Sequence, residues 1–376
     1  MNIYLDNAAT TPLDPKVLEA MTPYLLNHFG NPSSKHGPGR EAKNALENCR
    51  KTIANLLNAD PEEIIFTSGG TEADNIAIVS AITCGKIDHV ITTAFEHPAV
   101  LQTLKALNKQ YKTRVSFIRH DENGNLDLKH LEYLLNTNTR NLVSVMHANN
   151  EIGNLNDIES IGELCEKYGA LFHTDTVQTI GHYQHDLKQL KIHYLTASAH
   201  KFHGPKGVGF LYCCKGQRLN RLIHGGGQES GLRAGTENIP GIVGMTKALE
   251  LSYQHLEKDA TYIENLKHHL INALTEALPN ITFNGNSANP DKSLYTVLSV
   301  SLPATDIDLL QYLDAEDIAV SGGSACSGGA PSHVLKALGA DTSRNTIRFS
   351  FSKFNTTAEL DQVAEKLARV YGLVAA

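Results

Sequence analysis

The feature that most constrains the fold is an alternation of short apolar runs with longer amphipathic stretches between residues 64 and 212. The apolar runs have the length of strands buried on both faces, and the stretches between them repeat apolar residues at helical spacing. We predict strands at residues 64–67, 90–93, 115–118, 142–146, 171–174, from 194 and at 208–212, and helices at 71–83, 99–107, 128–135 and 158–168. Such alternation forms βαβ units, so the sequence predicts an α/β fold with a parallel sheet covered by helices on both faces.

The segments on either side of this alternation suggest a second unit. Helices are predicted from Asp14-Pro15 and over residues 40–57, with a loop at 29–34 between them. After residue 212, a glycine-rich loop at 223–236 leads into a helix that begins at 239 and continues to about residue 278. Strands at 296–302 and 346–351 follow, and Thr356 and Glu359 form a capping box for a last helix. With the break near residues 250–260, we predict an N-terminal segment (1–15) packing on the small domain, a large domain (16–255) and a small C-terminal α+β domain (256–376).

Composition excludes several classes of protein. A chain of 376 residues with 41% hydrophobic and 19% charged residues is typical of a soluble globular protein with a large core. The net charge of -7 gives no sign of a nucleic-acid or membrane partner. The start lacks the features of a signal peptide, and no apolar run reaches membrane-spanning length. The six cysteines form no CxxC pair and no disulfide framework, so we expect free thiols, no metal site and a cytoplasmic location.

One lysine stands where a strand meets a turn. Lys201 follows the β-prone run from residue 194, has Ser198 and His200 beside it, and precedes a Gly-Pro-Lys-Gly break at 204–207. A lysine whose pKa is lowered by its surroundings becomes a nucleophile and forms Schiff bases, including with pyridoxal phosphate. Our hypothesis is that Lys201 holds such a cofactor; the alternative is an ordinary solvated loop lysine.

A second turn has the composition of a phosphate site. Residues 67–72 link a predicted strand to a predicted helix through Gly69 and Gly70, followed by Thr71. Backbone N–H groups and a hydroxyl at a helix N-terminus suit a phosphate. A tight turn with a threonine cap is the alternative interpretation.

Further polar residues follow predicted strands, where open α/β sheets bind their ligands. They are His97, Asn150, Asp175 and Gln178. Asp175 could form an ion pair with a protonated ring nitrogen, and Gln178 lies close enough in sequence to reach a neighbouring ring substituent. Alternatively, Asp175 caps the segment after it.

Two residues of the C-terminal part have unusual surroundings. Cys326 is flanked by glycines and serines at residues 322–330, which is atypical of a packed face and indicates a reactive thiol on an exposed loop. Arg348 lies within a β-like run, where an inward-facing arginine needs a carboxylate partner. A bidentate clamp on a substrate carboxylate would supply one, and a protein carboxylate is the alternative.

Together these residues resemble the cysteine desulfurases of the NifS/IscS type, within the class V aminotransferase family. The resemblance runs from residues 4–12 (YLDNAATTP) to 347–350 (IRFS). Its most specific motifs are residues 149–153 (NNEIG), 198–201 (SAHK), 224–229 (HGGGQE) and 324–326 (SAC). The resemblance implies a fold-type-I homodimer with a mostly parallel seven-stranded sheet in the large domain. It also implies conversion of L-cysteine into L-alanine with pyridoxal 5'-phosphate as cofactor.

The resemblance also implies a role for each site residue. Lys201 carries the cofactor and removes the substrate Cα proton. His97 stacks on the ring and exchanges protons, Asp175 pairs with the ring nitrogen, and Gln178 contacts the ring oxygen. Cys326 takes the sulfur as a persulfide. The residues implied to complete the cofactor site are Gly70, Thr71, Asn150, Ser198, His200 and, from the partner subunit, Thr236. The residues implied to orient the substrate are Asn31, Asn150 and Arg348.

Two departures from the family pattern concern delivery of the sulfur. The loop after Cys326 is about two residues shorter than in the commonest members, and the chain ends soon after its last helix, without a tail that docks a scaffold protein. The acceptor, in iron–sulfur cluster assembly or tRNA thiolation, therefore stays open. Alternatives are a selenocysteine lyase, another class V aminotransferase, or a cofactor-free sulfur-relay or scaffold protein. An aminotransferase would have no use for Cys326.

Overall fold

The computed structural model describes residues 3–136, 139–322 and 332–373 of the chain. Cys326 lies outside these ranges. The main sheet has seven strands in the order β2-β8-β7-β6-β5-β3-β4, as the resemblance implied. Their bounds are β2 Ile64–Thr67, β3 His89–Thr92, β4 Arg114–Phe117, β5 Asn141–Ser144, β6 Leu171–Asp175, β7 Tyr194–Ser198 and β8 Gly209–Cys213. Predicted and observed strand ends differ by two residues at most.

The sheet is mostly parallel, with β8 as the exception. β8 pairs antiparallel with both of its neighbours, β7 and β2. The mostly parallel sheet that the resemblance implied is confirmed, and its antiparallel strand lies next to the β2 edge. Only residues 199–208 connect β7 to β8, and a parallel crossover needs a dozen residues or more.

Helices cover both faces of the sheet, as predicted. They are α1 Pro15–Leu26, α2 Gly37–Leu56, α3 Gly70–Thr83, α4 Pro98–Tyr111, α5 Leu128–Leu135, α6 Ile158–Lys167 and α7 Ile239–Gln254. One core joins α2, α5, α6 and α7 to the sheet, and a second core joins α3 and α4 to its other face. Successive residues of one strand enter different cores, as Leu142 and Val143 of β5 do. The inner strands are therefore apolar on both sides, which is why they appear as unbroken apolar runs in the sequence.

The C-terminal part has its own sheet and core. An antiparallel sheet of order β12-β10-β9 packs against α8 and α11, and two further short strands, β1 and β11, pair in parallel. The bounds are β1 Ile3–Tyr4, α8 Leu256–Ala277, β9 Thr282–Phe283, β10 Val297–Leu302, α9 Leu309–Ala315, β11 Ile318–Ala319, α10 His333–Leu338, β12 Asn345–Ser350 and α11 Thr357–Val370. The predicted capping box of Thr356 and Glu359 is confirmed at the start of α11.

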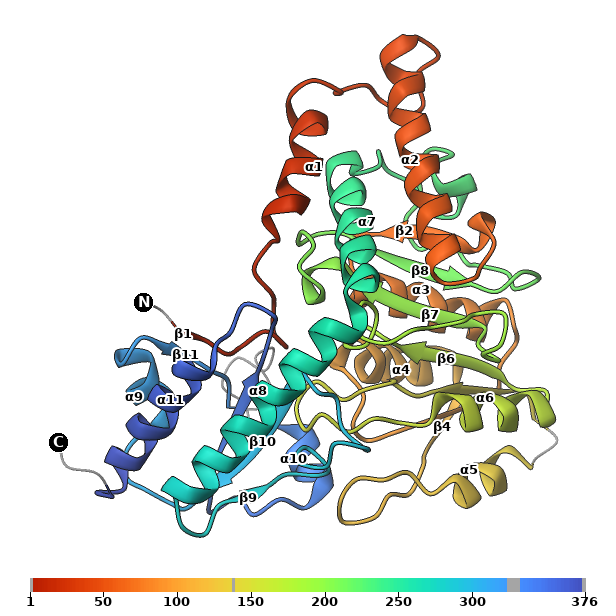
Figure 1. Cartoon of the computed structure of the whole chain (residues 1–376). Helices are drawn as coiled ribbons and strands as arrows, with labels where there is room; N and C mark the ends of the chain where they lie inside the picture. Colours follow the sequence, from red (N-terminus) through yellow and green to blue (C-terminus); the bar gives the residue numbers. More distant parts are fainter. Residues whose placement is uncertain (1–2, 137–138, 323–331, 374–376) are drawn as a thin grey trace.

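The predicted continuous helix over 239–278 is wrong, because it is two helices. α7 ends at Gln254 and α8 begins at Leu256, with His255 at φ -116° between them. α7 buries Met245 in the core of the large sheet, whereas α8 buries Leu266 in the C-terminal core. One straight helix cannot serve both cores. Figure 1 shows α8 running from the large sheet towards the C-terminal part. The domain division near this break stays a prediction.

The first residues of the chain pack against its last third. β1 pairs with β11, Asp6 forms a bridge with Ser350, and Asn7 donates a hydrogen bond to the Ser350 carbonyl (2.8 Å). Residues 8–11 then pass the carboxyl end of β7 before α1 begins. In the described part of the chain, no helix is both long and apolar enough to cross a membrane.

Candidate active site

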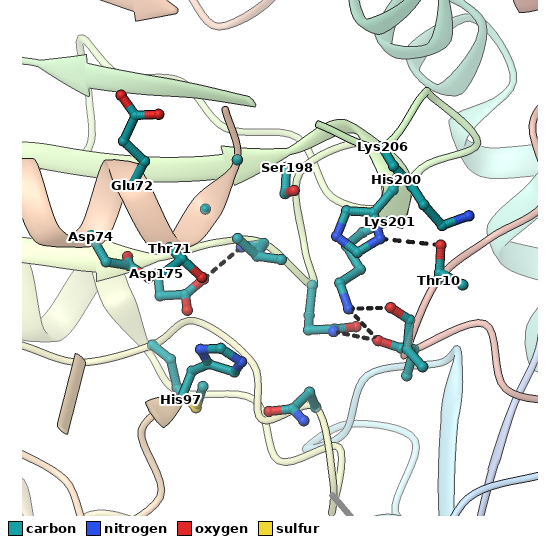
Figure 2. Close-up of a pocket in the computed structure, with 18 of the residues that line it drawn as sticks. Thr10, Thr71, Glu72, Asp74, His97, Asp175, Ser198, His200, Lys201 and Lys206 are labelled. Atoms are coloured by element: carbon teal, nitrogen blue, oxygen red, sulfur yellow. Dashed lines mark hydrogen bonds between the residues drawn. The ribbon is translucent and has the colours of Figure 1, made fainter. Parts of the chain in front are cut away.

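A cavity of about 460 Å³ lies where the carboxyl ends of β6 and β7 meet the start of α3 (Figure 2). This is the size of a small-molecule site, at the edge of the sheet where α/β folds bind ligands. Ten of the predicted site residues line it: Gly70, Thr71, His97, Asn150, Asp175, Gln178, Ser198, His200, Lys201 and Arg348. They come from widely separated segments of the chain, and the fold brings them together.

Lys201 ends the short 3-10 turn Ala199–Lys201 that follows β7. Its Nζ atom donates hydrogen bonds to the carbonyl oxygens of Ala8 (2.6 Å) and Ala9 (2.8 Å), and Figure 2 shows the side chain directed into the cavity. The lysine is therefore partly buried and oriented by backbone oxygens rather than extended into solvent. The amine is therefore held at the cavity, and its role as a nucleophile stays a prediction.

The turn before α3 forms a cradle for an anion. Gly69 is the N-cap residue, with φ +153°, and no side chain caps the helix. A Cβ atom on Gly70 would lie 2.6 Å from Cγ2 of Val177, so the close approach of the two segments requires glycine there. Gly69, Gly70 and Thr71 line the cavity together with Ser198, at the positive end of a 14-residue helix, where backbone N–H groups favour an anion.

His200 completes the polar wall near this cradle. Its Nδ1 atom lies 3.2 Å from the hydroxyl of Thr10. Burial, followed by the charges of Lys201 and Lys206, lowers the pKa of His200 to about 4. At neutral pH the ring is therefore uncharged and offers one N–H donor to an anion.

Asp175 ends β6 on the opposite side of the cavity, and its Oδ1 atom accepts a hydrogen bond from the N–H of Val177 (2.9 Å). This contact is the local cap that the sequence offered as an alternative. It uses one oxygen, so the carboxylate can still accept further hydrogen bonds. Burial, followed by the charge of Asp74, raises the pKa of Asp175 to about 6. A buried carboxyl of this kind is stabilised when a cation arrives.

His97 caps α4 through its ring. Its Nδ1 atom accepts a hydrogen bond from the N–H of Ala99 (3.1 Å), so in the neutral ring the proton is on Nε2. The preceding residue, Glu96, is fully buried and accepts hydrogen bonds from Thr93 (2.8 Å) and from the N–H of Met146 (3.0 Å). Glu96 thereby fixes the loop that presents His97.

Arg348 has the protein carboxylate partner that was the alternative interpretation. Its side chain is 1% exposed, Nη2 donates to Asp6 Oδ1 (2.7 Å) and Nη1 donates to the carbonyl of Asn150 (2.9 Å). Its Nε atom, however, is buried and has no hydrogen-bond partner in the described structure. Arg348 also lines the cavity, so an incoming carboxylate would share its guanidinium group with Asp6.

Two predicted residues do not reach this cavity. Asn31 is exposed in the loop between α1 and α2, where its side chain accepts the N–H of Ser33 (2.9 Å). Thr236 lines a smaller neighbouring cavity behind Ser68. Neither residue is among those that line the larger cavity.

Two arginine–carboxylate pairs hold the glycine-rich loop that carries Thr236, one to α3 and the other to α2. Arg233 in the loop binds Glu72 of α3 through Nε (2.8 Å) and Nη2 (3.2 Å). Glu229 in the loop binds Arg50 through both oxygens (2.8 and 2.7 Å). Glu229 also accepts a hydrogen bond from the backbone N–H of Phe66, and Glu72 accepts one from that of Ser68. Such bidentate pairs fix geometry as well as charge, so loop and cradle are held as one unit.

Sequence reasoning missed several residues of the cavity wall. They are Ala8, Ala9, Thr10, Glu72, Asp74 and Lys206. The N-terminal residues could not be assigned from local pattern, because their position depends on packing across the chain. Asp74 left a signal: it lies three residues after Thr71 on a predicted helix, and residues at that spacing share a face.

The cavity fits pyridoxal phosphate in its donor set. It combines a glycine cradle at a helix N-terminus, a buried carboxylate able to stabilise a cationic ring nitrogen, and a lysine amine between them. Gln178 Nε2 donates to the carbonyl of Ala8 (3.0 Å), which keeps that side chain beside Lys201. No group of three potential metal ligands occurs among the residues with described positions.

Comparison with known proteins agrees with this geometry. The model of the family Aminotransferase class-V matches residues 3–363. Cysteine desulfurase IscS of Dictyoglomus turgidum is 41% identical over 376 residues, which cover 98% of this chain and 94% of that protein. A solved NifS-like protein superposes with a TM-score of 0.91 at 38% identity and full coverage of both chains. The structure of SspA in complex with cysteine has a TM-score of 0.81 at 34% identity, over 94% of this chain and 100% of that one.

A family match over nearly the whole chain, a cysteine desulfurase relative of similar length and a NifS-like fold all agree with the site described above. This chain belongs to the class V aminotransferase family, within its group of cysteine desulfurases.

Proposed function

We propose that this protein converts L-cysteine into L-alanine, using pyridoxal phosphate held by Lys201, and transfers the sulfur to Cys326. The observation that carries the proposal is the convergence of ten separately predicted residues on one cavity. A relative named cysteine desulfurase and a similar structure with cysteine bound support the choice of substrate.

The described residues suit the tasks that this reaction sets. When bound, pyridoxal phosphate supplies an electron sink for the electron pair released at the substrate Cα atom. The cradle of α3, Ser198 and His200 would hold its phosphate, Asp175 its ring nitrogen and Gln178 its ring oxygen. Arg348 would bind the substrate carboxylate, and Asn150 lies beside it. Lys201 lines the same cavity and would take the Cα proton of the substrate.

Sulfur transfer needs a thiolate and a proton. The Cys326 thiolate would attack the substrate sulfur, so that an S–S bond forms, the C–S bond breaks and the persulfide stays on the enzyme. The electron pair of the broken C–S bond stays with Cβ, which takes up a proton, and Cα regains the proton that it lost, so alanine results. His97 lines the cavity, and its Nε2–H would donate a proton in this step. Delivery from Cys326 to an acceptor protein, for iron–sulfur clusters or tRNA thiolation, is part of the proposal.

The proposal includes a homodimer. Thr236 and Asn31 lie outside the cavity of their own subunit, and α1 with the loop after it exposes large apolar side chains. They are Leu18 (49%), Leu25 (54%), Leu26 (70%) and Phe29 (82%). A second subunit covering this region would remove those side chains from water and allow Thr236 to reach the partner's phosphate site.

Incubation with L-cysteine, with alanine and persulfide assayed together, tests the function. We expect yellow protein, one alanine per sulfur released, and loss of the visible band in Lys201→Ala. Cys326→Ala should keep the colour and lose the persulfide. Protein that stays colourless after addition of pyridoxal phosphate would refute the cofactor assignment, and unchanged sulfide release by Cys326→Ala would refute the role of that thiol.

A further inference from the structure

Asp74 is a buried carboxylate of the cavity wall that the mechanism above does not use. It lies in the first turns of α3, is 1% exposed and lines the cavity together with Asp175. Figure 2 shows the two side chains next to each other, on the side opposite Lys201. Two carboxyl groups therefore share the wall where a ring nitrogen would bind.

The contacts of Asp74 fix its position. Its Oδ1 atom accepts a hydrogen bond from the hydroxyl of Thr196 on β7 (2.8 Å). The Nε2 atom of His173 on β6 lies 3.3 Å from the same oxygen, and both side chains are buried. His173 Nδ1 lies 2.9 Å from the hydroxyl of Ser144. Asp74 thus joins α3 to two strands and is held at one depth in the wall.

The charge of Asp74 is poorly compensated. Within the part of the chain that is described, its one ion-pair contact is with His173, whose pKa burial lowers to about 4. His173 is therefore neutral near pH 7 and gives Asp74 a dipole rather than a charge. Burial raises the pKa of Asp74 to about 6, and the charge of Asp74 contributes to the raised pKa of Asp175.

The remaining titratable neighbours do not supply a fixed cation. Glu96 faces both carboxylates, and burial raises its pKa to about 8, so it is neutral near pH 7. His97 faces both carboxylates and lowers the pKa of Asp74 and of Asp175. The contact of Asp74 with His173 is the ion pair found for these two carboxylates among the described residues, so a cation that enters the cavity would stabilise their ionised forms.

We propose that Asp74 is a positioning residue of the cofactor site, which places a second negative charge behind Asp175 and so favours the protonated form of the cofactor's ring nitrogen. This inference rests on the proposed function, because it assumes pyridoxal phosphate with its ring nitrogen at Asp175. The proton on that nitrogen is held by two carboxylates: Asp175 by direct pairing and Asp74 through its charge. A role limited to joining α3 to the sheet would give no preference between a nitrogen and a carbon at that ring position.

The test compares two ligands rather than two activities. Apoprotein is titrated at about pH 8, where both carboxylates are ionised, with pyridoxal phosphate and with its 1-carba analogue, in which CH replaces the ring nitrogen. The dissociation constant of the analogue divided by that of pyridoxal phosphate measures what the ring proton contributes to binding. We expect Asp74→Asn, which keeps the shape and an acceptor for Thr196, to reduce this ratio by about tenfold, the effect of one pKa unit on the ring nitrogen.

Thr196→Val is the matched control. It removes the 2.8 Å hydrogen bond but leaves the carboxylate, so it should weaken both ligands equally and leave the ratio within about threefold of the original. Asp74→Ser removes the same charge and takes the place of the Asn variant if that variant does not fold. A ratio unchanged in the charge-removing variant overturns the inference. Failure of the unmodified protein to bind pyridoxal phosphate would instead refute the proposed function.

Discussion

Arg348 is the residue that, in the proposed function, binds the substrate carboxylate while it still holds Asp6 of its own chain. Its guanidinium group is buried and holds Asp6 through one nitrogen and the Asn150 carbonyl through another, and its buried Nε has no hydrogen-bond partner among the described residues. An arginine with a planar fork can serve a second carboxylate without leaving the first. A lysine ammonium lacks this planar fork and cannot reproduce the two-sided, bidentate geometry.

We therefore expect Arg348→Lys to raise KM for L-cysteine by roughly 10- to 100-fold, the effect of losing a charge-assisted pair of hydrogen bonds. The visible band of the bound cofactor should be unchanged. Steady-state alanine formation gives KM, and the spectrum reports cofactor content. Arg344→Lys is the control, because Arg344 binds Ser301 and the Asn280 carbonyl outside the cavity wall. An unaltered KM in the Arg348 variant would contradict the assignment.

At the scale of elements, α8 supports the loop that presents Asn150. Lys267 of α8 is 3% exposed, and its Nζ donates to the Ser293 hydroxyl (2.8 Å) and the Leu294 carbonyl (3.0 Å). Leu294 in turn donates its N–H to the carbonyl of Gly153 (2.7 Å). Burial lowers the pKa of Lys267 to about 7 from an ordinary value of 10.5. Two N–H donors suffice for these bonds, so the neutral amine satisfies them.

This shift predicts how stability depends on pH. Between about pH 7 and 10.5 the unfolded chain binds a proton at Lys267 that the folded chain does not, so this group's contribution to the free energy of unfolding rises with pH. Lys267→Met should abolish that rise. Urea unfolding at about pH 7 and about pH 9 should show the deficit of the variant growing at the higher pH. The exposed Lys258 of the same helix provides the control Lys258→Met. An equal deficit at both pH values would count against a neutral Lys267.

The sequence predicted the elements well where one local rule decides them. Strands such as β5 are buried on both faces and appear as apolar runs, and the turns after them carry the site residues. Prediction from the sequence failed for features that depend on contacts between distant parts of the chain. Nothing local indicates that α7 and α8 enter different cores, or that Ala8 and Ala9 accept the hydrogen bonds of Lys201. Asp74 was missed because α3 is buried on several sides, so its apolar pattern marks no single polar face.

For the whole molecule, the proposed dimer explains why two predicted residues lie outside the cavity. The exposed apolar side chains of α1 and the loop after it lie in the same region as Asn31. If a second subunit covers them, charge introduced there costs association, because an unpaired charge must be desolvated. Thr236 would be withdrawn from the partner's site at the same time.

We expect the double variant Leu26→Asp, Phe29→Asp to sediment as a monomer at concentrations where the unmodified protein is a dimer. Its affinity for pyridoxal phosphate should fall by at least about tenfold, since each phosphate loses a donor from the other subunit. Tyr133→Asp is the matched control, because Tyr133 is 74% exposed on α5. A double variant that still sediments as a dimer would place the interface elsewhere.

Residues 3–11 connect parts of the molecule that are distant in the sequence. Residues 3–7 are fixed to β11 and β12, and the next two residues supply both carbonyl oxygens that hold Lys201. The backbone is continuous from the C-terminal sheet to Ala8 and Ala9. A displacement of that sheet would therefore also displace the two carbonyl oxygens that accept hydrogen bonds from Lys201. A shift too small to open the cavity could therefore still change where that amine points.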